Sequence, residues 1–474
     1  MRINREPRMS VIPLVRMSAA DNVMSAPYGG CRGDISGDIT MISDIPPCHK
    51  VACEDIASGG SVVKYGCAIG VASQAIKKGE WVHDHNMHSA GRGTKPAACE
   101  WKGPYIYDMR APRVFAGFRR RGARPGIRND LWVIPTARSV GNKLKQFIAN
   151  YHKPYWIDDV RLLDYPSFRA GADLDETLDI LLGLSRAPNT AGVLFAGADG
   201  ENMPMTDICH RALSEGGRVA CTVLRENTAN IAASCLDDLA AASPRRREEF
   251  PVSELCVGIR GAAGGYSGLS ANPLLGRFAE RMASQGTAVL TPAGAYMADI
   301  REAISKRITS HAAYDKFAAA ASAYPPTAPP DEWENGATTQ KERALASCPI
   351  TGKSPVTAFL GYGETAARTG GVQIVPNAGE LASDCVIFAA AGAQLILVAT
   401  ERMTPFGGAV PTAQISSSDE KANRHPEYAD FSAGTILMGE SLDDAAKRLE
   451  DYAISVACGE KVSHDMRVIR GVAG

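Results

Sequence analysis

The feature that most constrains the fold is an alternation of helical and buried-strand patterns that begins near Val114. Residues 174–186 (LDETLDILLGLSR) place apolar side chains at helical spacing, and Asp173 before them is suited to cap a helix. A Pro-Asn pair then predicts a turn, and residues 192–197 (GVLFAG) are apolar, as in a buried strand. This order indicates an α/β fold with a mostly parallel sheet.

The same pattern of apolar strands and helices is found elsewhere in the chain after Val114. Apolar runs predict strands at residues 131–137, 286–292 and 392–400. Ser441 and the acids after it predict the start of a last helix, which should end at Gly459. The segment 324–351 is rich in proline and polar residues, so we predict a long loop there.

The first ninety residues have a different pattern. Short β-like runs alternate with glycines, which predicts a small all-β domain. A small, polar stretch then reads as a linker, and the charged segment 243–251 predicts a second boundary. We therefore expect a multidomain α/β chain with an N-terminal all-β domain (10–90), a linker (91–112) and two α/β domains with mostly parallel sheets (113–245 and 250–474).

Composition and charge indicate which kinds of partner and which cellular compartment to expect. The formal net charge is −1 over 474 residues, which favours no nucleic-acid partner. The 12 cysteines form no CxxC pair and predict reduced thiols. The N-terminus lacks the pattern of a signal peptide, and the most apolar run, residues 385–400, is short for a membrane span. We expect a cytoplasmic protein with no membrane partner.

The densest chemical cluster is the sequence HDHNMH. If residues 82–86 are extended, His83 and His85 share one face, and a turn could bring His88 back to them. Neutral imidazoles on one face suit a divalent metal or acid–base chemistry. The alternative is an exposed, histidine-rich strand end beside a linker.

A second cluster contains five arginines between Arg119 and Arg128, followed by Asn129. Guanidinium groups bind carboxylates in a bidentate manner, so this loop could hold an acidic substrate. The alternative is a solvated loop. Further along, the glycine-rich segment 258–268 would let backbone N–H groups approach an anion.

Several long motifs in this order resemble those of the altronate/galactarate dehydratase family. The resemblance covers nearly the whole chain and places a SAF-type (β-clip) domain at the N-terminus. The motifs are CHKVACEDI (48–56), VVKYGCAIG (62–70), KKGEWVHDHN (77–86), GFRRRGARPGIRN (117–129), SGLSANPLLGR (267–277), GAQLILVAT (392–400), TPFGGAVPT (404–412) and ADFSAG (429–434).

This resemblance implies a metal-dependent hydro-lyase that removes water from a sugar acid such as altronate or galactarate and forms a 2-keto-3-deoxy acid. It implies catalysis by His83, His85 and Lys50, with His49 and Lys64 in the same domain. Arg119, Arg128, Asn129, Ser267, Asn272 and Thr404 would bind substrate. His83, His85 and His88 would hold Fe²⁺, Mn²⁺ or Mg²⁺.

The chain departs from the family pattern where thiolates and carboxylates would stand. A Cys-Gly-Gly-Ser-Asp pattern reads Arg260-Gly-Ala-Ala-Gly264, and an Arg-Gly-Thr-Pro pattern reads Glu401-Arg-Met-Thr-Pro405. An alternative function is therefore a non-catalytic homologue that binds a sugar acid or partners an intact paralogue. A different reaction on a carboxylate is a third possibility. We expect a homo-oligomer, or a hetero-oligomer with such a paralogue.

Overall fold

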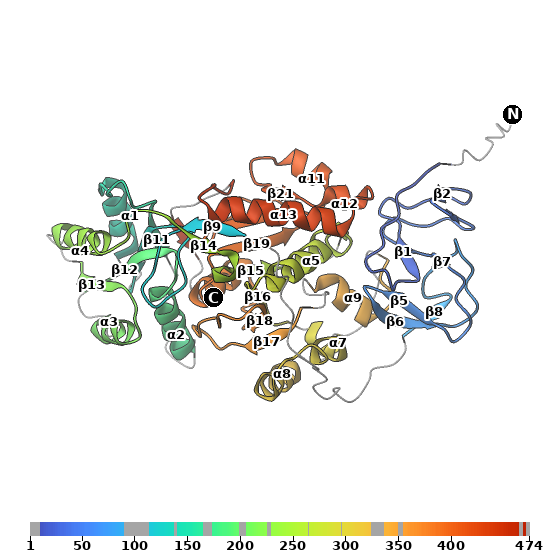
Figure 1. Ribbon diagram of the computed structural model, residues 1–474, viewed down its shortest axis with the longest axis horizontal. Helices are drawn as coiled ribbons and strands as arrows, with labels where there is room; N and C mark the ends of the chain where they lie inside the picture. The colour runs from blue at the N-terminus through green and yellow to red at the C-terminus, as the bar shows by residue number, and fades with distance from the viewer. Residues whose placement is uncertain are drawn as a thin grey trace.

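The computed structural model has three units in a row (Figure 1). An all-β unit lies at one end, a small α/β unit at the other, and a larger α/β unit between them. The predicted linker, residues 91–112, lies outside the described residues. The structure describes residues 10–89, 113–136, 140–164, 173–198, 205–224, 229–263, 265–294, 296–323, 336–348, 354–463 and 468–470.

The N-terminal unit is built from short antiparallel strands, as predicted. Lys64 pairs with Cys67 across the β5–β6 hairpin, so Tyr65 and Gly66 form a two-residue turn, and both have positive φ, as a type I′ turn requires. The strands are β1 (Val23–Ser25), β2 (Ile35–Ser36), β3 (Ile39–Thr40), β4 (Lys50–Ala52), β5 (Ser61–Lys64), β6 (Cys67–Ala72), β7 (Trp81–Val82) and β8 (Met87–His88).

The second unit is a parallel sheet in the order β13-β12-β10-β11-β22. Its strands are β10 (Asp130–Pro135), β11 (Val160–Asp164), β12 (Thr190–Gly197), β13 (Val219–Val223) and β22 (Val468–Arg470). Its helices are α1 (Gly141–Asn150), α2 (Asp173–Ser185), α3 (Met205–Ser214) and α4 (Ala229–Ala241). An antiparallel ribbon of β9 (Val114–Gly117) and β14 (Glu248–Pro251) leads into and out of it.

The third unit contains a larger parallel sheet in the order β17-β18-β16-β15-β19-β20-β21. Its strands are β15 (Cys256–Arg260), β16 (Ala288–Pro292), β17 (Val356–Phe359), β18 (Gly371–Val375), β19 (Leu395–Thr400), β20 (Thr412–Ser416) and β21 (Phe431–Ser432). Its described helices are α5 (Ala271–Ser284), α6 (Tyr296–Asp299), α7 (Arg301–Ser305), α8 (His311–Ala323), α9 (Gln340–Ser347), α10 (Leu381–Ala390), α11 (Asp419–Arg424), α12 (Gly434–Leu437) and α13 (Leu442–Ala457).

Helices cover both faces of this sheet. Helices α5 and α13 pack together over one face, and α10 packs against α2 of the second unit. Gly183 allows that approach, because a Cβ there would lie 2.6 Å from the carbonyl oxygen of Ala390. The sequence-predicted α/β class with mostly parallel sheets is confirmed.

The predicted strands and the last helix are confirmed, with two differences elsewhere. Ser441 caps α13, since its hydroxyl accepts a hydrogen bond from the Asp444 N–H, and Gly459 follows with a positive φ. The long loop predicted at 324–351 is wrong in part, because it contains α9. Strand β22 pairs with β11, so the end of the chain returns to the second unit.

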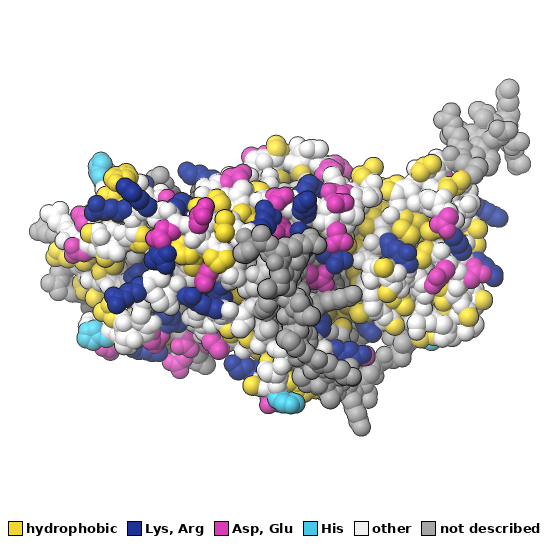
Figure 2. Space-filling model, viewed as in Figure 1, with side chains coloured by type: hydrophobic (Ala, Val, Ile, Leu, Met, Phe, Trp, Pro, Cys, Tyr) yellow, Lys and Arg dark blue, Asp and Glu magenta, His cyan; other side chains and the backbone are white. Residues whose placement is uncertain are grey.

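Charged side chains of both signs are scattered over the face shown in Figure 2. No helix among the described residues has the length and apolarity needed to cross a membrane.

Candidate active site at the carboxyl edge of the central sheet

The topology of the third unit points to one edge of its sheet. Strand β15 lies between β16 on one side and β19 on the other, so the chain reverses its direction of travel across the sheet at β15. In open parallel sheets, ligands bind outside the carboxyl ends of the strands at such a point. Neighbouring strands are about 4.8 Å apart, so the residues that follow β15, β19 and β20 are close in space.

Arg260 ends β15 and is held in place by a buried carboxylate. Its Nε donates to Asp384 Oδ2 on α10 at 2.7 Å. The other oxygen of Asp384 accepts a hydrogen bond from the Ala378 N–H, 3.0 Å away, in the loop after β18. Asp384 is 1% exposed and Arg260 is 24% exposed. The guanidinium is therefore positioned while still reachable from solvent.

A second ion pair joins β19 to α11. Glu401, directly after β19, forms an ion pair with Lys421. Its Oε1 accepts a hydrogen bond of 2.6 Å from the Ser267 N–H. Gly265 makes room for this carboxylate, because a Cβ there would lie 2.7 Å from it and Gly265 has a positive φ. Both charged groups are partly exposed, and a proton could pass between them and a bound molecule.

The N-terminal unit supplies one wall of this edge. Tyr28 lies against Tyr266 with ring centroids 5.9 Å apart, and the ammonium of Lys421 lies 5.7 Å from the Tyr266 ring centroid. Cys48 is buried beside them, and burial raises the pKa of its thiol to about 11. The thiol is therefore protonated near neutral pH and is a poor nucleophile.

Two buried hydroxyls at this edge have unused hydrogen-bonding capacity. Ser267 and Ser417 are completely buried, and within the described residues their Oγ atoms have no hydrogen-bond partner. Between them, the Ser270 hydroxyl donates to the Ser417 carbonyl at 2.7 Å. Because an unpaired buried hydroxyl is costly, the two groups are candidates to contact a polar ligand.

Three of the predicted substrate-binding residues lie at this edge. Ser267 is described above. Asn272, at the start of α5, braces the loop after β15, since its side chain bonds both the N–H and the carbonyl of Ala262. Thr404 is exposed in the loop after β19, and its carbonyl accepts from the Gln414 side chain at 2.7 Å.

The three other predicted substrate contacts are elsewhere. The buried guanidinium of Arg128 donates to the carbonyls of Ile127, Val456 and Glu460, and the buried Asn129 amide donates to Trp156 and Pro244. Arg119 pairs with Glu248 on the β9–β14 ribbon, far from the all-β unit in Figure 1. The prediction that these groups converge with the histidines is wrong, because Arg128 binds the end of α13, Asn129 binds within the second unit and Arg119 binds within the β9–β14 ribbon.

The structure places Lys50, predicted to be catalytic, in a buried ion-pair cluster. Its Nζ is completely buried and bonds to Glu342 at 2.9 Å and to the Gly336 carbonyl. Lys64 bonds the other oxygen of Glu342 at 3.0 Å. Although burial alone would raise it, the two ammonium groups hold the pKa of Glu342 at about 2. These three side chains connect the all-β unit to α9.

The histidines do not share a strand face. Strand β7 ends at Val82, and Asn86 closes a turn by accepting from the His83 N–H and donating to the Trp81 carbonyl. His83 stacks on Trp81 at 5.1 Å and on His49 at 4.9 Å, while His85 tilts against Trp81 at 5.0 Å. His88 is exposed in β8.

The structure does not place His83, His85 and His88 on one strand face, as the sequence suggested. Stacked rings direct their nitrogen lone pairs outward in the ring planes, and His83 Nδ1 is engaged by Asp84 at 2.7 Å. Among the residues that the structure describes, no three His, Cys, Asp or Glu side chains are grouped as metal ligands. We therefore derive no catalytic step through a metal.

The contact of His49 with the rings of Trp81 and His83 leads to a prediction about pH and stability. Burial, together with His83 and Lys50, lowers the pKa of His49 from 6.5 to about 4. The unfolded chain then binds more protons than the folded chain between these values, so stability falls as pH drops from about 6.5 to 4. Urea unfolding at pH 7 and pH 5 should show a smaller loss for His49→Gln than for the unmutated protein. Equal losses would contradict this.

Sequence reasoning missed most of the groups at the carboxyl edge. In the sequence, Arg260 and Glu401 stand out only as departures from a family pattern, and no motif marks Asp384, Lys421 or Tyr28. One signal was available: Glu401 directly follows a predicted apolar strand. Charged residues at such positions share one edge of a parallel sheet.

Three family models match the chain. They are described as "Altronate/galactarate dehydratase SAF domain" (residues 12–90), "D-galactarate dehydratase/Altronate hydrolase, second domain" (117–243) and "D-galactarate/Altronate dehydratase, C-terminal" (252–471). The predicted SAF-type domain is thereby confirmed.

Three similar proteins align with most of this chain. Altronate dehydratase of Bacillus subtilis is 30% identical over 97% of this chain and 98% of its own length. Galactarate dehydratase (L-threo-forming) of Escherichia coli is 25% identical over 89% of this chain and 88% of its own length. The (2R)-sulfolactate sulfo-lyase subunit beta of Chromohalobacter salexigens is 24% identical over 73% of this chain and 93% of its own length. The chain belongs to the altronate/galactarate dehydratase family.

Proposed function

We propose that this protein is a hydro-lyase that removes water from a sugar acid, such as altronate or galactarate, at the carboxyl edge of the central sheet. The product is a 2-keto-3-deoxy acid. The observation that carries the proposal is the grouping, near the ends of β15, β19 and β20, of two cations, two carboxylates and two buried hydroxyls that have no hydrogen-bond partner among the described residues. The relatives named altronate and galactarate dehydratase support the reaction class.

The chemistry sets clear demands on the site. The proton α to a carboxylate is weakly acidic, and its removal leaves a doubly charged enediolate that cations must stabilise. Arg260 and Lys421 supply positive charge, and Glu401 is the candidate base for the α-proton. Ser267 and Ser417 would orient substrate hydroxyls. Tyr28 and Tyr266 would shield the site from water on the side of the N-terminal unit.

A screen against hexonates and aldarates tests the proposal. Purified protein, alone and supplied with Fe²⁺, Mn²⁺ or Mg²⁺, is expected to release a 2-keto acid from at least one sugar acid. The divalent ion stays a prediction, and elemental analysis of the purified protein checks it. Loss of the metal in His83→Ala would support the histidine cluster, whereas unchanged metal content would remove it.

A second function is favoured by one relative. The sulfo-lyase relative is named as a subunit, and at the edge described here each cation already has a carboxylate partner of its own. A catalytically inactive protein that binds a sugar acid or joins an intact paralogue fits these facts. A blank screen with every metal, together with measurable binding of a sugar acid, would favour this function over catalysis.

A further inference from the structure

The N-terminal unit touches the candidate active site through two tyrosines. Tyr28 lies against Tyr266, and the hydroxyl of Tyr65 donates to the carbonyl oxygen of Gly268 at 2.9 Å. Both partners belong to one short 3₁₀ turn, η3 (Gly265–Gly268). The same turn carries one of the two buried hydroxyls described above. Side chains from a different unit therefore meet the turn that presents this hydroxyl at the carboxyl edge.

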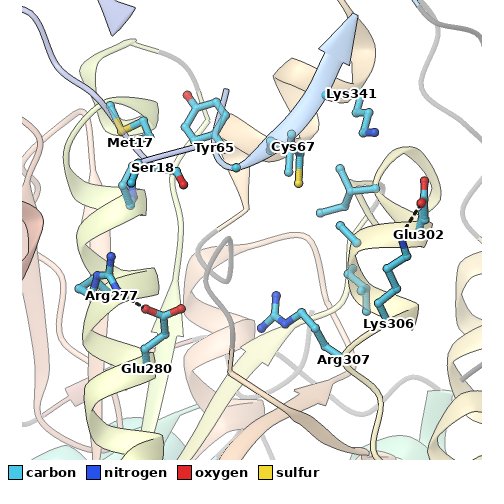
Figure 3. Close-up of a pocket in the computed structure, with 18 of the residues that line it drawn as sticks. Met17, Ser18, Tyr65, Cys67, Arg277, Glu280, Glu302, Lys306, Arg307 and Lys341 are labelled. Carbon is cyan, nitrogen blue, oxygen red and sulfur yellow. Dashed lines mark hydrogen bonds and ion pairs between the residues drawn. The ribbon is translucent and has the colours of Figure 1, made fainter. Parts of the chain in front are cut away.

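Tyr65 is placed by an unusual backbone conformation. It lies in the turn of the β5–β6 hairpin and lines one cavity together with Arg277 and Glu280 of α5 (Figure 3). It is buried and has a φ of 58°, a left-handed conformation that bulky side chains rarely adopt. Strain of this kind persists where the surrounding structure holds it in place. Here the strained turn brings the Tyr65 hydroxyl to Gly268.

The third unit holds the rest of η3. The Ser267 N–H donates to Glu401 at 2.6 Å. Gly268 packs closely on α9, because a Cβ there would lie 3.0 Å from the Cβ of Ala346. The turn is therefore fixed on one side by the candidate base and on the other by the N-terminal unit. Such preorganisation lowers the cost of binding a ligand.

Tyr28 also has a defined position. The N–H groups of Cys48 and Gly29 both donate to the Ala26 carbonyl, at 2.7 and 3.2 Å, and Gly29 has a positive φ. These bonds close a tight turn around Tyr28. The side chain stays 50% exposed, although its ring lies against Tyr266. The turn therefore presents a half-exposed phenol at the carboxyl edge.

Charged groups of α11 act on this phenol. Burial raises the pKa of the Tyr28 hydroxyl, and the carboxylates of Asp419 and Glu420 raise it further. The phenol is therefore protonated near neutral pH and can donate a hydrogen bond. Lys421 follows these acids, and its ammonium lies 5.7 Å from the centroid of the Tyr266 ring. Tyr28 and Lys421 thus both contact the Tyr266 ring.

A sugar acid carries, beyond its reacting carbons, a chain of C–H and hydroxyl groups. A phenol has an apolar body and a polar tip, so it can pack on such a chain and bond one of its hydroxyls. We propose that the N-terminal unit completes the substrate site: Tyr28 contacts the hydroxyl-bearing chain of the sugar acid, and Tyr65 is a positioning residue that acts through η3. This inference rests on the proposed function.

The roles of these tyrosines differ from that of the candidate base. Tyr28 contacts carbons that do not react, so its contact is equally strong with the substrate and with the transition state. Loss of such uniform binding raises KM and leaves kcat nearly unchanged. Loss of Glu401, in contrast, removes the acceptor of the α-proton and lowers kcat.

Isothermal titration calorimetry with altronate and galactarate tests the inference. The full chain carries Glu401→Gln, so that binding is measured without turnover. At least one probe should bind, and Tyr28→Ala should weaken its binding about 10-fold. Tyr28→Phe and Tyr65→Phe each lose one hydroxyl and should weaken it about 3- to 10-fold. With Glu401 intact, each variant should raise KM by the same factor and keep kcat within about threefold.

Two tyrosines of the second unit are matched controls. Tyr155→Ala removes an exposed ring, and Tyr151→Phe removes a hydroxyl that bonds to Asp237 at 2.7 Å. Both should leave binding unchanged. The inference is overturned if Tyr28→Ala and Tyr65→Phe bind as these controls do, or if neither probe binds at millimolar concentration. A blank screen for dehydration, with binding that Tyr28→Ala still weakens, would reject the proposed reaction and support this binding site.

Discussion

Glu342→Gln is expected to destabilise the protein by about 3–5 kcal/mol, the largest stability effect that we foresee for a single side chain. Glu342 is 1% exposed and lies between Lys50 and Lys64 at 2.9 and 3.0 Å. A neutral amide leaves two buried ammonium groups without a counter-charge. Since Lys50 and Lys64 belong to the N-terminal unit, the loss should first appear as undocking of that unit from α9.

Urea unfolding followed by circular dichroism measures this loss, and hydrogen exchange of the α9 amides locates it. A matched control is Glu420→Gln, which breaks the exposed ion pair with Arg424 and should cost less than about 1 kcal/mol. Replacing all three charges at once, in Lys50→Met/Lys64→Met/Glu342→Leu, should recover much of the stability. Equal midpoints for Glu342→Gln and Glu420→Gln would show that the buried cluster does not hold the units together.

The same cluster gives a pH signature. The folded pKa of Glu342 is about 2, below its ordinary value of 4.5. The unfolded chain therefore binds more protons in this range, and the stabilising contribution is present above about pH 4.5 and is lost as pH falls toward 2. Glu342→Gln has no carboxyl to titrate there. Its stability should consequently fall less steeply with acid than that of the unmutated protein.

The fold could be predicted further than the site, and the reason is physical. Strands such as β12 and β19 are buried along almost their whole length, so their sequences are apolar and can be recognised without knowing their neighbours. Helix α9 was missed because prolines precede it and because charge, rather than an apolar stripe, drives its burial. Its key side chain, Glu342, is stabilised by two lysines almost 300 positions earlier in the chain.

The arginines show the same limit of sequence-based prediction: the role of a side chain depends on partners that are distant in the sequence. Arg119 and Arg128 lie in one motif, yet one is exposed and the other is consumed by backbone carbonyls of the α13 end. No local pattern distinguishes the two, because the carbonyls come from a segment more than 300 residues away. The turn at His83 is different, since Asn86 three residues later is a known local signal for a turn and could have been used.

At the carboxyl edge, Lys421→Met is expected to lower kcat/KM for the sugar acid by about 100- to 1,000-fold. The ammonium of Lys421 lies against Glu401 and near the Tyr266 ring, where positive charge would stabilise the enediolate. Glu401→Gln should lower kcat by a similar factor of about 100 or more, because the base for the α-proton is lost while the cation remains. Steady-state kinetics on the substrate identified by the screen measures both effects.

The two variants can be separated by following the α-proton itself. In D₂O, Glu401→Gln should show no exchange of the substrate α-proton, whereas Lys421→Met should retain slow exchange because its base is intact. Lys447→Ala, an exposed lysine on α13, is the control and should behave as the unmutated protein. Circular dichroism should show that all three fold. Loss of a charge at a reacting centre should lower the rate far more than about threefold. If Lys421→Met and Glu401→Gln both turn over within about threefold of the unmutated rate, the reaction therefore takes place away from this edge.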